Sequence, residues 1–107
     1  ESVAQIRSTV NRLTFRSRSF ERQAMEYYDK AKEAVKHRNN VAGKFYLGRW
    51  QRCQVLMNRY DRMRASLDDS IAAIESASDD VEMNQALSLA AGELSRAQKV
   101  VDVEKSV

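Results

Sequence analysis

Proline is absent from the 107-residue sequence, and glycine occurs only three times. At average usage a chain of this length would contain about five prolines. Alanine, arginine, glutamate, lysine, leucine and methionine, which favour helices, are plentiful instead. This composition predicts an all-α fold.

Side chains that carry catalysis or bind metals are also scarce. His37 is the only histidine, so a histidine-based triad or metal cluster would lack its partners. Cys53 is the only cysteine, which excludes an internal disulfide and fits a reducing compartment. It falls on an apolar helix position, where we interpret it as a core residue rather than a nucleophile. We therefore expect no enzyme activity, no cofactor, no metal site and a cytoplasmic location.

Long hydrophobic runs are missing as well, because no apolar stretch reaches the roughly 20 residues that a membrane-spanning helix needs. Apolar residues recur instead at alternating spacings of four and three, which is typical of helices that pack along a coiled-coil seam. The first series is Ile6, Val10, Leu13, Ser17, Phe20, Ala24, Tyr27, Ala31 and Ala34. The second is Ala42, Tyr46, Arg49, Cys53, Leu56, Tyr60, Met63, Leu67, Ser70, Ile74 and Ala77. The third is Met83, Leu87, Ala90, Leu94, Ala97 and Val101.

These three series predict helices at about residues 3–38, 41–77 and 80–105. The first two form a long antiparallel helical hairpin, and the third helix docks on the second or continues it. We treat residues 1–107 as a single helical core. If the chain stayed helical between the first two series, the first seam would need a partner in another chain.

Two short segments separate the helices. Asparagine tolerates the left-handed conformation that ends a helix and also caps the next helix, so the hairpin turn is predicted at Arg38, Asn39 and Asn40. A continuous helix through this point is the alternative. The second break is predicted as a hinge at Ser78, Asp79 and Asp80. Here Asp79, with Glu82 three residues later, resembles a capping box.

Charge is divided unevenly along the chain. Residues 1–64 contain 15 Lys and Arg against 6 Asp and Glu, whereas residues 65–107 contain 3 against 9. This uneven distribution of charge predicts an anionic partner for the positive part, or association between the positive part of one chain and the negative part of another. The predicted membrane-binding residues are Arg7, Arg12, Arg16, Arg18, Arg22, Lys32 and Lys36. Phosphates of lipids and of nucleic acids both attract such side chains, and a solvated face of an inert coiled-coil scaffold is a further alternative.

Four stretches resemble the ESCRT-III family, which comprises the charged multivesicular body proteins and their archaeal cell-division relatives. They are LTFRSRSFERQA, KAKEAVKHRNNVAGKFYLGRWQRC, LDDSIAAIESASDD and ALSLAAGELSRAQKVVDVEKSV. The likeness consists of a basic first helix, a hairpin turn, a second helix entered through small residues and an acidic joint. The chain has Asn39-Asn40 where the family usually has Gly-Asn.

The resemblance implies a membrane-remodelling or membrane-scission subunit without enzyme activity. Members of the family polymerise, alone or with other ESCRT-III subunits, into filaments on anionic membranes, where they are peripheral, and a AAA ATPase disassembles them. We expect two family segments to lie outside these residues, namely the short membrane-inserting amino-terminal segment and the regulatory carboxyl tail that the ATPase recognises. The remaining alternatives are an inert coiled-coil scaffold and, ranked lower, a nucleic-acid-binding hairpin.

Overall fold

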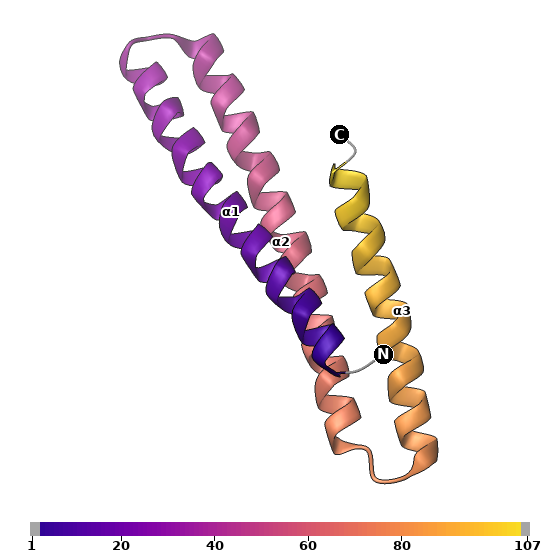
Figure 1. The fold of residues 1–107 in the computed structure, drawn as a ribbon. Helices are drawn as coiled ribbons and strands as arrows, with labels where there is room; N and C mark the ends of the chain where they lie inside the picture. Colours follow the sequence, from indigo (N-terminus) through magenta and orange to yellow (C-terminus); the bar gives the residue numbers. More distant parts are fainter. Residues whose placement is uncertain (1–2, 106–107) are drawn as a thin grey trace. The chain divides into compact units, whose positions relative to one another are not determined.

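The structure is a computed structural model that describes the backbone of residues 3–105 and the side chains of residues 3–103. Within this range the chain forms three helices and no strand: α1 (Val3–Lys36), α2 (Asn40–Ser76) and α3 (Asp80–Lys105) (Figure 1). The predicted all-α fold of a helical hairpin with a third helix is confirmed.

The chain divides into two compact units. Unit 1 combines Glu1–Leu13 with Arg62–Val107, and unit 2 is Thr14–Asp61. Unit 2 therefore contains most of α1, the turn and the first half of α2, whereas unit 1 contains the start of α1, the end of α2 and all of α3. The single core that the sequence predicts for residues 1–107 stays a prediction.

Unit 2 is an antiparallel pair of helices that bury the predicted seam (Figure 1). Tyr60 is its most deeply buried large side chain, with 0% of its surface exposed. The Tyr60 ring meets the edge of the Phe20 ring at a centroid distance of 5.5 Å. Ser17, a polar seam residue, is buried and donates a hydrogen bond of 2.8 Å to the Asp61 carboxylate. This hydrogen bond replaces the bonds to water that the hydroxyl group loses on burial.

The turn between α1 and α2 closes with a left-handed residue, which is Arg38 (φ 59°) and not one of the two asparagines. The amide of Asn39 donates to the carbonyl of Ala34 (2.8 Å), and the amide of Arg38 donates to the carbonyl of Val35 (2.9 Å). This pair of bonds is the Schellman motif that ends many helices. The expectation that an asparagine takes the left-handed position is therefore wrong. Asn39 caps α2 instead, because its Oδ1 accepts from the amide of Ala42 (3.1 Å).

Gly43 explains why α2 begins among small residues. It is buried in the first turns of α2, and a Cβ placed on it would lie 3.2 Å from the Cγ2 atom of Val35. A side chain at this position would therefore be in tight contact with Val35 of α1. Glycine therefore permits the close approach that a short connection requires.

Replacing Arg38 by glycine is expected to stabilise unit 2. A non-glycine residue in the left-handed conformation costs about 1–2 kcal/mol, of which glycine's greater freedom in the unfolded chain returns part. We expect a net gain of about 0.5–1 kcal/mol, visible as a rise of a few degrees in the melting temperature followed by circular dichroism. Asn39→Ala is the matched control, because it removes the cap of α2 and should cost about 1 kcal/mol. A lower melting temperature for Arg38→Gly would contradict the left-handed conformation of Arg38.

Unit 1 brings three helical segments together. Ile6 and Leu13 of α1, Leu67 of α2 and Ala90 of α3 are buried, and all four belong to the predicted series. The other buried apolar residues of this unit are Ile71, Ile74, Ala86 and Ala97, and of these Ile71 and Ala86 lie outside the series. A helix that is contacted by two neighbours buries a wider stripe than the narrow seam of a helix pair, which accounts for these two residues.

Candidate functional site

The α1 basic face, as defined here, consists of Arg18, Arg22, Lys32 and Lys36, four of the predicted membrane-binding residues that belong to unit 2. All four side chains are exposed. At about 100° of rotation per residue they lie within about 80° of one another, on the side of α1 away from the seam. Within residues 3–103 none of the four forms an ion pair. These positive charges are therefore available to an anionic ligand.

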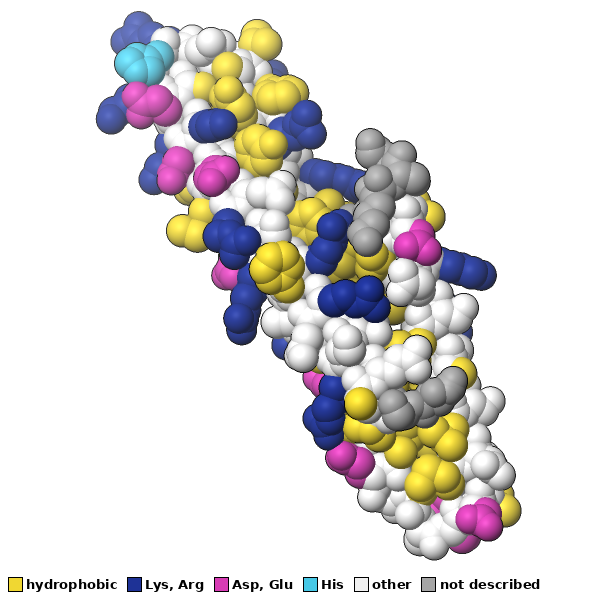
Figure 2. Space-filling model, viewed as in Figure 1, with side chains coloured by type: hydrophobic (Ala, Val, Ile, Leu, Met, Phe, Trp, Pro, Cys, Tyr) yellow, Lys and Arg dark blue, Asp and Glu magenta, His cyan; other side chains and the backbone are white. Residues whose placement is uncertain are grey.

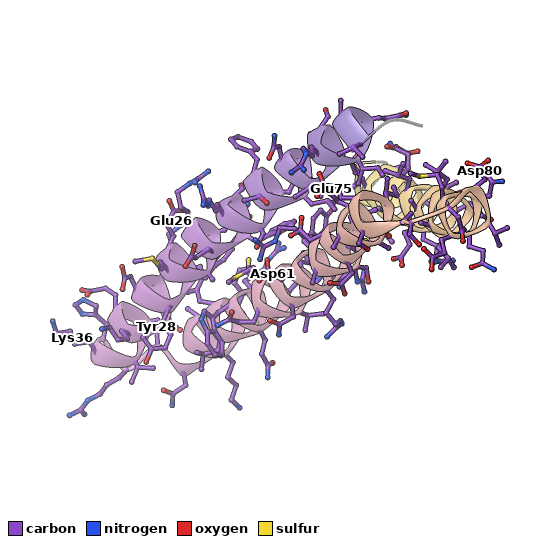
Figure 3. The ribbon with its side chains drawn as sticks, turned by 90° about the horizontal axis from the view of Figure 1, so that it is seen from below. Glu26, Tyr28, Lys36, Asp61, Glu75 and Asp80 are labelled. Atoms are coloured by element: carbon purple, nitrogen blue, oxygen red, sulfur yellow. The ribbon has the colours of Figure 1, made fainter. Side chains whose placement is uncertain are left out.

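Acidic side chains interrupt this face toward the carboxyl end of α1. Glu26, Asp29 and Glu33 are all exposed, and Asp29 falls between the basic positions on the helical wheel. Figure 3 shows Glu26 on the side of α1 that faces away from α2, and Lys36 in the last turn. The positive potential of α1 is therefore weaker here than the arginines of its first half suggest.

Arg16 has a different environment from the other predicted residues. Its side chain is half-buried, and its Cζ atom lies 5.6 Å from the ring centroids of both Phe20 and Tyr60. The guanidinium therefore makes cation–π contacts with the two rings that connect α1 to α2. Sequence reasoning placed Arg16 with the membrane-binding residues because it could not foresee Tyr60 across the seam.

Arg7 and Arg12 belong to unit 1, and both are exposed. Arg7 donates a hydrogen bond of 2.8 Å to Glu75, and more than half of each side chain remains exposed. Because water and salt screen exposed pairs, this contact contributes little to stability, and an anionic surface can compete for Arg7.

A basic and apolar surface at the start of α2 was not predicted from the sequence. This tip face consists of Val41, Lys44, Phe45, Arg49 and Arg52, and all five side chains are exposed. Near the turn, which the single histidine marks, Figure 2 shows Lys and Arg side chains with hydrophobic side chains between them. The available signal was the charge of residues 30–52, which contain seven Lys and Arg and only one Asp or Glu.

The predicted turn and hinge residues lie between helices or at a helix start. Arg38 and Asn39 connect α1 to α2, and Asn40 is the first residue of α2. Ser78 and Asp79 connect α2 to α3, and Asp80 is the first residue of α3. The role of Ser78, Asp79 and Asp80 as a hinge stays a prediction.

The joint between α2 and α3 is closed by a variant of the predicted capping box, in which Asp79 caps α3 and the Glu82 carboxylate bonds to Ser78 instead of the Asp79 amide. The amide of Glu82 donates to Asp79 Oδ1 (2.8 Å), and Glu82 Oε1 accepts from the amide (2.8 Å) and the hydroxyl (2.6 Å) of Ser78. The side-chain and backbone hydrogen bonds from Ser78 lower the pKa of the Glu82 carboxyl below its ordinary value of 4.5. These bonds from Ser78 are therefore strongest when Glu82 is ionised.

Acid is expected to open this capping box. Because folding lowers the pKa of Glu82, its stabilising effect is present above about pH 4.5 and is lost as the pH falls through the lower folded value. The chemical shift of the Ser78 amide proton should therefore titrate with a midpoint below 4.5. In Glu82→Gln, whose side chain does not titrate, that midpoint should disappear. An identical acid transition in both proteins would assign it to another group.

The described residues contain no metal-binding cluster and no membrane-spanning helix. Cys53 is buried, and burial raises the pKa of its thiol more than the nearby Arg49 charge lowers it, which keeps the thiol protonated at neutral pH. Across the described part of the chain, no group of three or more His, Cys, Asp and Glu side chains could hold a metal ion. None of the described helices is both apolar enough and long enough to cross a bilayer.

A surface groove lies between α1 and α2 in unit 2. Its volume is about 570 Å³, and Met25, Tyr28, Trp50 and Met57 supply most of its apolar lining. The rings of Tyr28 and Trp50 are 5.9 Å apart, and Met25 and Tyr28 are exposed. The groove is open to a side chain of another molecule.

Comparison with known proteins identifies the family of the chain. The family model Snf7 matches residues 1–106, and this model is the ESCRT-III family domain. Searches of curated proteins and of solved structures gave no match. Snf7 proteins are structural, non-enzymatic polymer subunits that associate with membranes. The chain therefore belongs to the Snf7 family, that is, to ESCRT-III, and is a membrane-remodelling subunit of that general type.

Proposed function

We propose that this subunit assembles into filaments on anionic membranes and deforms them. The observation that carries the proposal is the exposed positive charge of unit 2, where no ion pair within residues 3–103 neutralises the α1 basic face. The excess of nine positive charges in residues 1–64 and of six negative charges in residues 65–107 extends the argument to assembly. The positive amino-terminal part of one subunit attracts the negative carboxyl-terminal part of its neighbour. The positive charge that is not neutralised in this way can bind lipid headgroups.

The expected strength of lipid binding favours a polymer over a single subunit. One basic residue near an anionic membrane contributes about 1 kcal/mol at best. Four such residues on the α1 basic face, partly offset by Asp29, would hold one subunit only weakly. A filament presents the same face many times, and multivalency converts weak binding into tight binding.

Assembly requires contacts between subunits, and the open apolar groove of unit 2 supports them. A second copy of the chain or another ESCRT-III subunit would cover Met25 and Tyr28, which are exposed in the free hairpin. On the family resemblance, we further propose that a AAA ATPase disassembles the filament and that the subunit acts from the cytoplasm, in membrane scission of the kind used in protein transport and cell division.

Co-sedimentation with vesicles of graded anionic content tests this function, with electron microscopy of the same samples. Bound protein should increase with the fraction of anionic lipid and decrease from low to high salt, because exposed charges are screened over about 8 Å at 0.15 M ionic strength. Filaments should appear on anionic vesicles. Equal binding to neutral vesicles, or a preference for duplex DNA in competition, would reject the membrane assignment. No binding and no assembly would favour the inert scaffold.

A further inference from the structure

A second positively charged region of unit 2 surrounds the turn and extends along the start of α2. Between Lys30 and Arg52 the only acidic residue is Glu33, and its carboxylate lies 2.9 Å from the His37 ring nitrogen. From the start of α2 to Tyr60 the sequence contains no Asp or Glu at all. The positive charge of the hairpin is therefore concentrated around the turn and along the first half of α2.

The tip face adds exposed hydrophobic surface to this charge. Val41 is 83% exposed and Phe45 is 56% exposed. They are four residues apart and therefore lie on the same side of α2, one turn from each other. The Phe45 ring lies 5.4 Å from the Tyr46 ring and 5.3 Å from the Arg49 guanidinium, and these contacts cover part of the Phe45 ring. Nothing in the described structure covers the remainder of these two side chains.

The flanking residues suit a surface that is apolar at depth and anionic at its boundary. Lys44, Arg49 and Arg52 are exposed around the two apolar side chains, and long basic side chains can keep their charge at a polar boundary while their stems lie on apolar surface. Basic and apolar helix surfaces of this kind bind in the interfacial region of anionic bilayers.

We infer that the tip face is a lipid-inserting contact: Val41 and Phe45 enter the boundary between headgroups and acyl chains of an anionic membrane, while Lys44, Arg49 and Arg52 bind the phosphates. This inference rests on the proposed function and identifies the part of the hairpin that reaches into the lipid. A duplex nucleic acid would use the same cations but would leave the Val41 side chain in water. The apolar pair therefore favours the membrane.

Removing the apolar pair without changing charge tests the inference. The double variant Val41→Ser, Phe45→Ser should bind anionic vesicles about tenfold more weakly, with an unchanged dependence on salt. The matched control is Val81→Ser, Leu89→Ser, because these α3 residues are 65% and 67% exposed but lie outside the tip face. The control should bind like the unchanged protein. Equal binding by all three proteins would overturn the inference while leaving the proposed function intact.

A fluorescence probe provides an independent measurement of insertion. In a Trp50→Phe background, Phe45→Trp should shift its emission to the blue on anionic vesicles and be quenched by lipids brominated along the acyl chains. Leu89→Trp in the same background should show neither effect. An unquenched probe at position 45 on vesicles that bind the protein would reject insertion.

Two further outcomes separate this inference from its alternatives. If the double serine variant assembles less than the unchanged protein without lipid, yet binds vesicles equally well per assembled subunit, the tip face is a contact between copies and the inference fails. If the unchanged protein binds no anionic vesicles, the proposed function and the inference fail together.

Discussion

Replacing Tyr60 by alanine is expected to lower the free energy of unfolding by about 3–5 kcal/mol. Tyr60 has no exposed surface, and its ring lies 5.5 Å from the Phe20 ring and 5.6 Å from the Arg16 guanidinium. A helix pair has one narrow seam, so few neighbours can move to fill the cavity. Because small proteins have only about 5–15 kcal/mol of total stability, the loss would leave unit 2 close to unfolding at room temperature.

Urea unfolding followed by circular dichroism measures this effect, and Phe20→Ala is the matched control. Phe20 is only half-buried, so its removal should cost clearly less than that of Tyr60. The buried thiol of Cys53 provides a second readout, since a thiol reagent should label it faster in Tyr60→Ala. Equal losses for the two variants would show that the Phe20 and Tyr60 rings share the core equally.

The spacing of apolar residues predicted which positions would be buried in the helix pair. Ala24 and Ala31 of α1 are buried, as are Leu56 and Tyr60 of α2. Phe20, Tyr27 and Tyr46 are only partly buried, and Arg49 is exposed, with its guanidinium over the Phe45 ring. Periodicity succeeds here because one helix contacts one partner along a line, and it fails for Ile71, where three helical segments meet.

Features that depend on a second helix could not be predicted from one. A helical wheel places Arg16 on its own helix but not beside Tyr60, which α2 brings across the seam. The left-handed conformation of Arg38 was assigned to its neighbours, because asparagine adopts it more readily than arginine. The tip face was overlooked because the sequence does not show which side chains near the turn are exposed. Exposure is a tertiary property, and only the structure assigns it to Val41 and Phe45.

Reversing the charge of Arg18, Arg22 and Lys32 to glutamate is expected to weaken binding to anionic vesicles about a hundredfold or more. Each basic residue at the surface contributes about 1 kcal/mol, and every factor of ten in affinity corresponds to about 1.4 kcal/mol. The three side chains are exposed and make no ion pair within residues 3–103. Lys32 lies 5.5 Å from the ring of Tyr28, which is itself exposed, so its reversal should change helicity little. Arg16 is left unchanged because its reversal would disturb the contact with Tyr60.

The matched control reverses Arg62, Arg96 and Lys99, which are exposed and belong to unit 1. Each reversal changes the charge by two, so both triple variants move from the +3 of the unchanged protein to −3. If net charge alone governs binding, the two variants lose affinity equally, and a specific α1 basic face is rejected. If the α1 variant binds like the unchanged protein, lipid binding must occur elsewhere, and the tip face becomes the first candidate. A selective loss in the α1 variant, with co-sedimentation of the control preserved, is the result expected if the α1 basic face binds lipid.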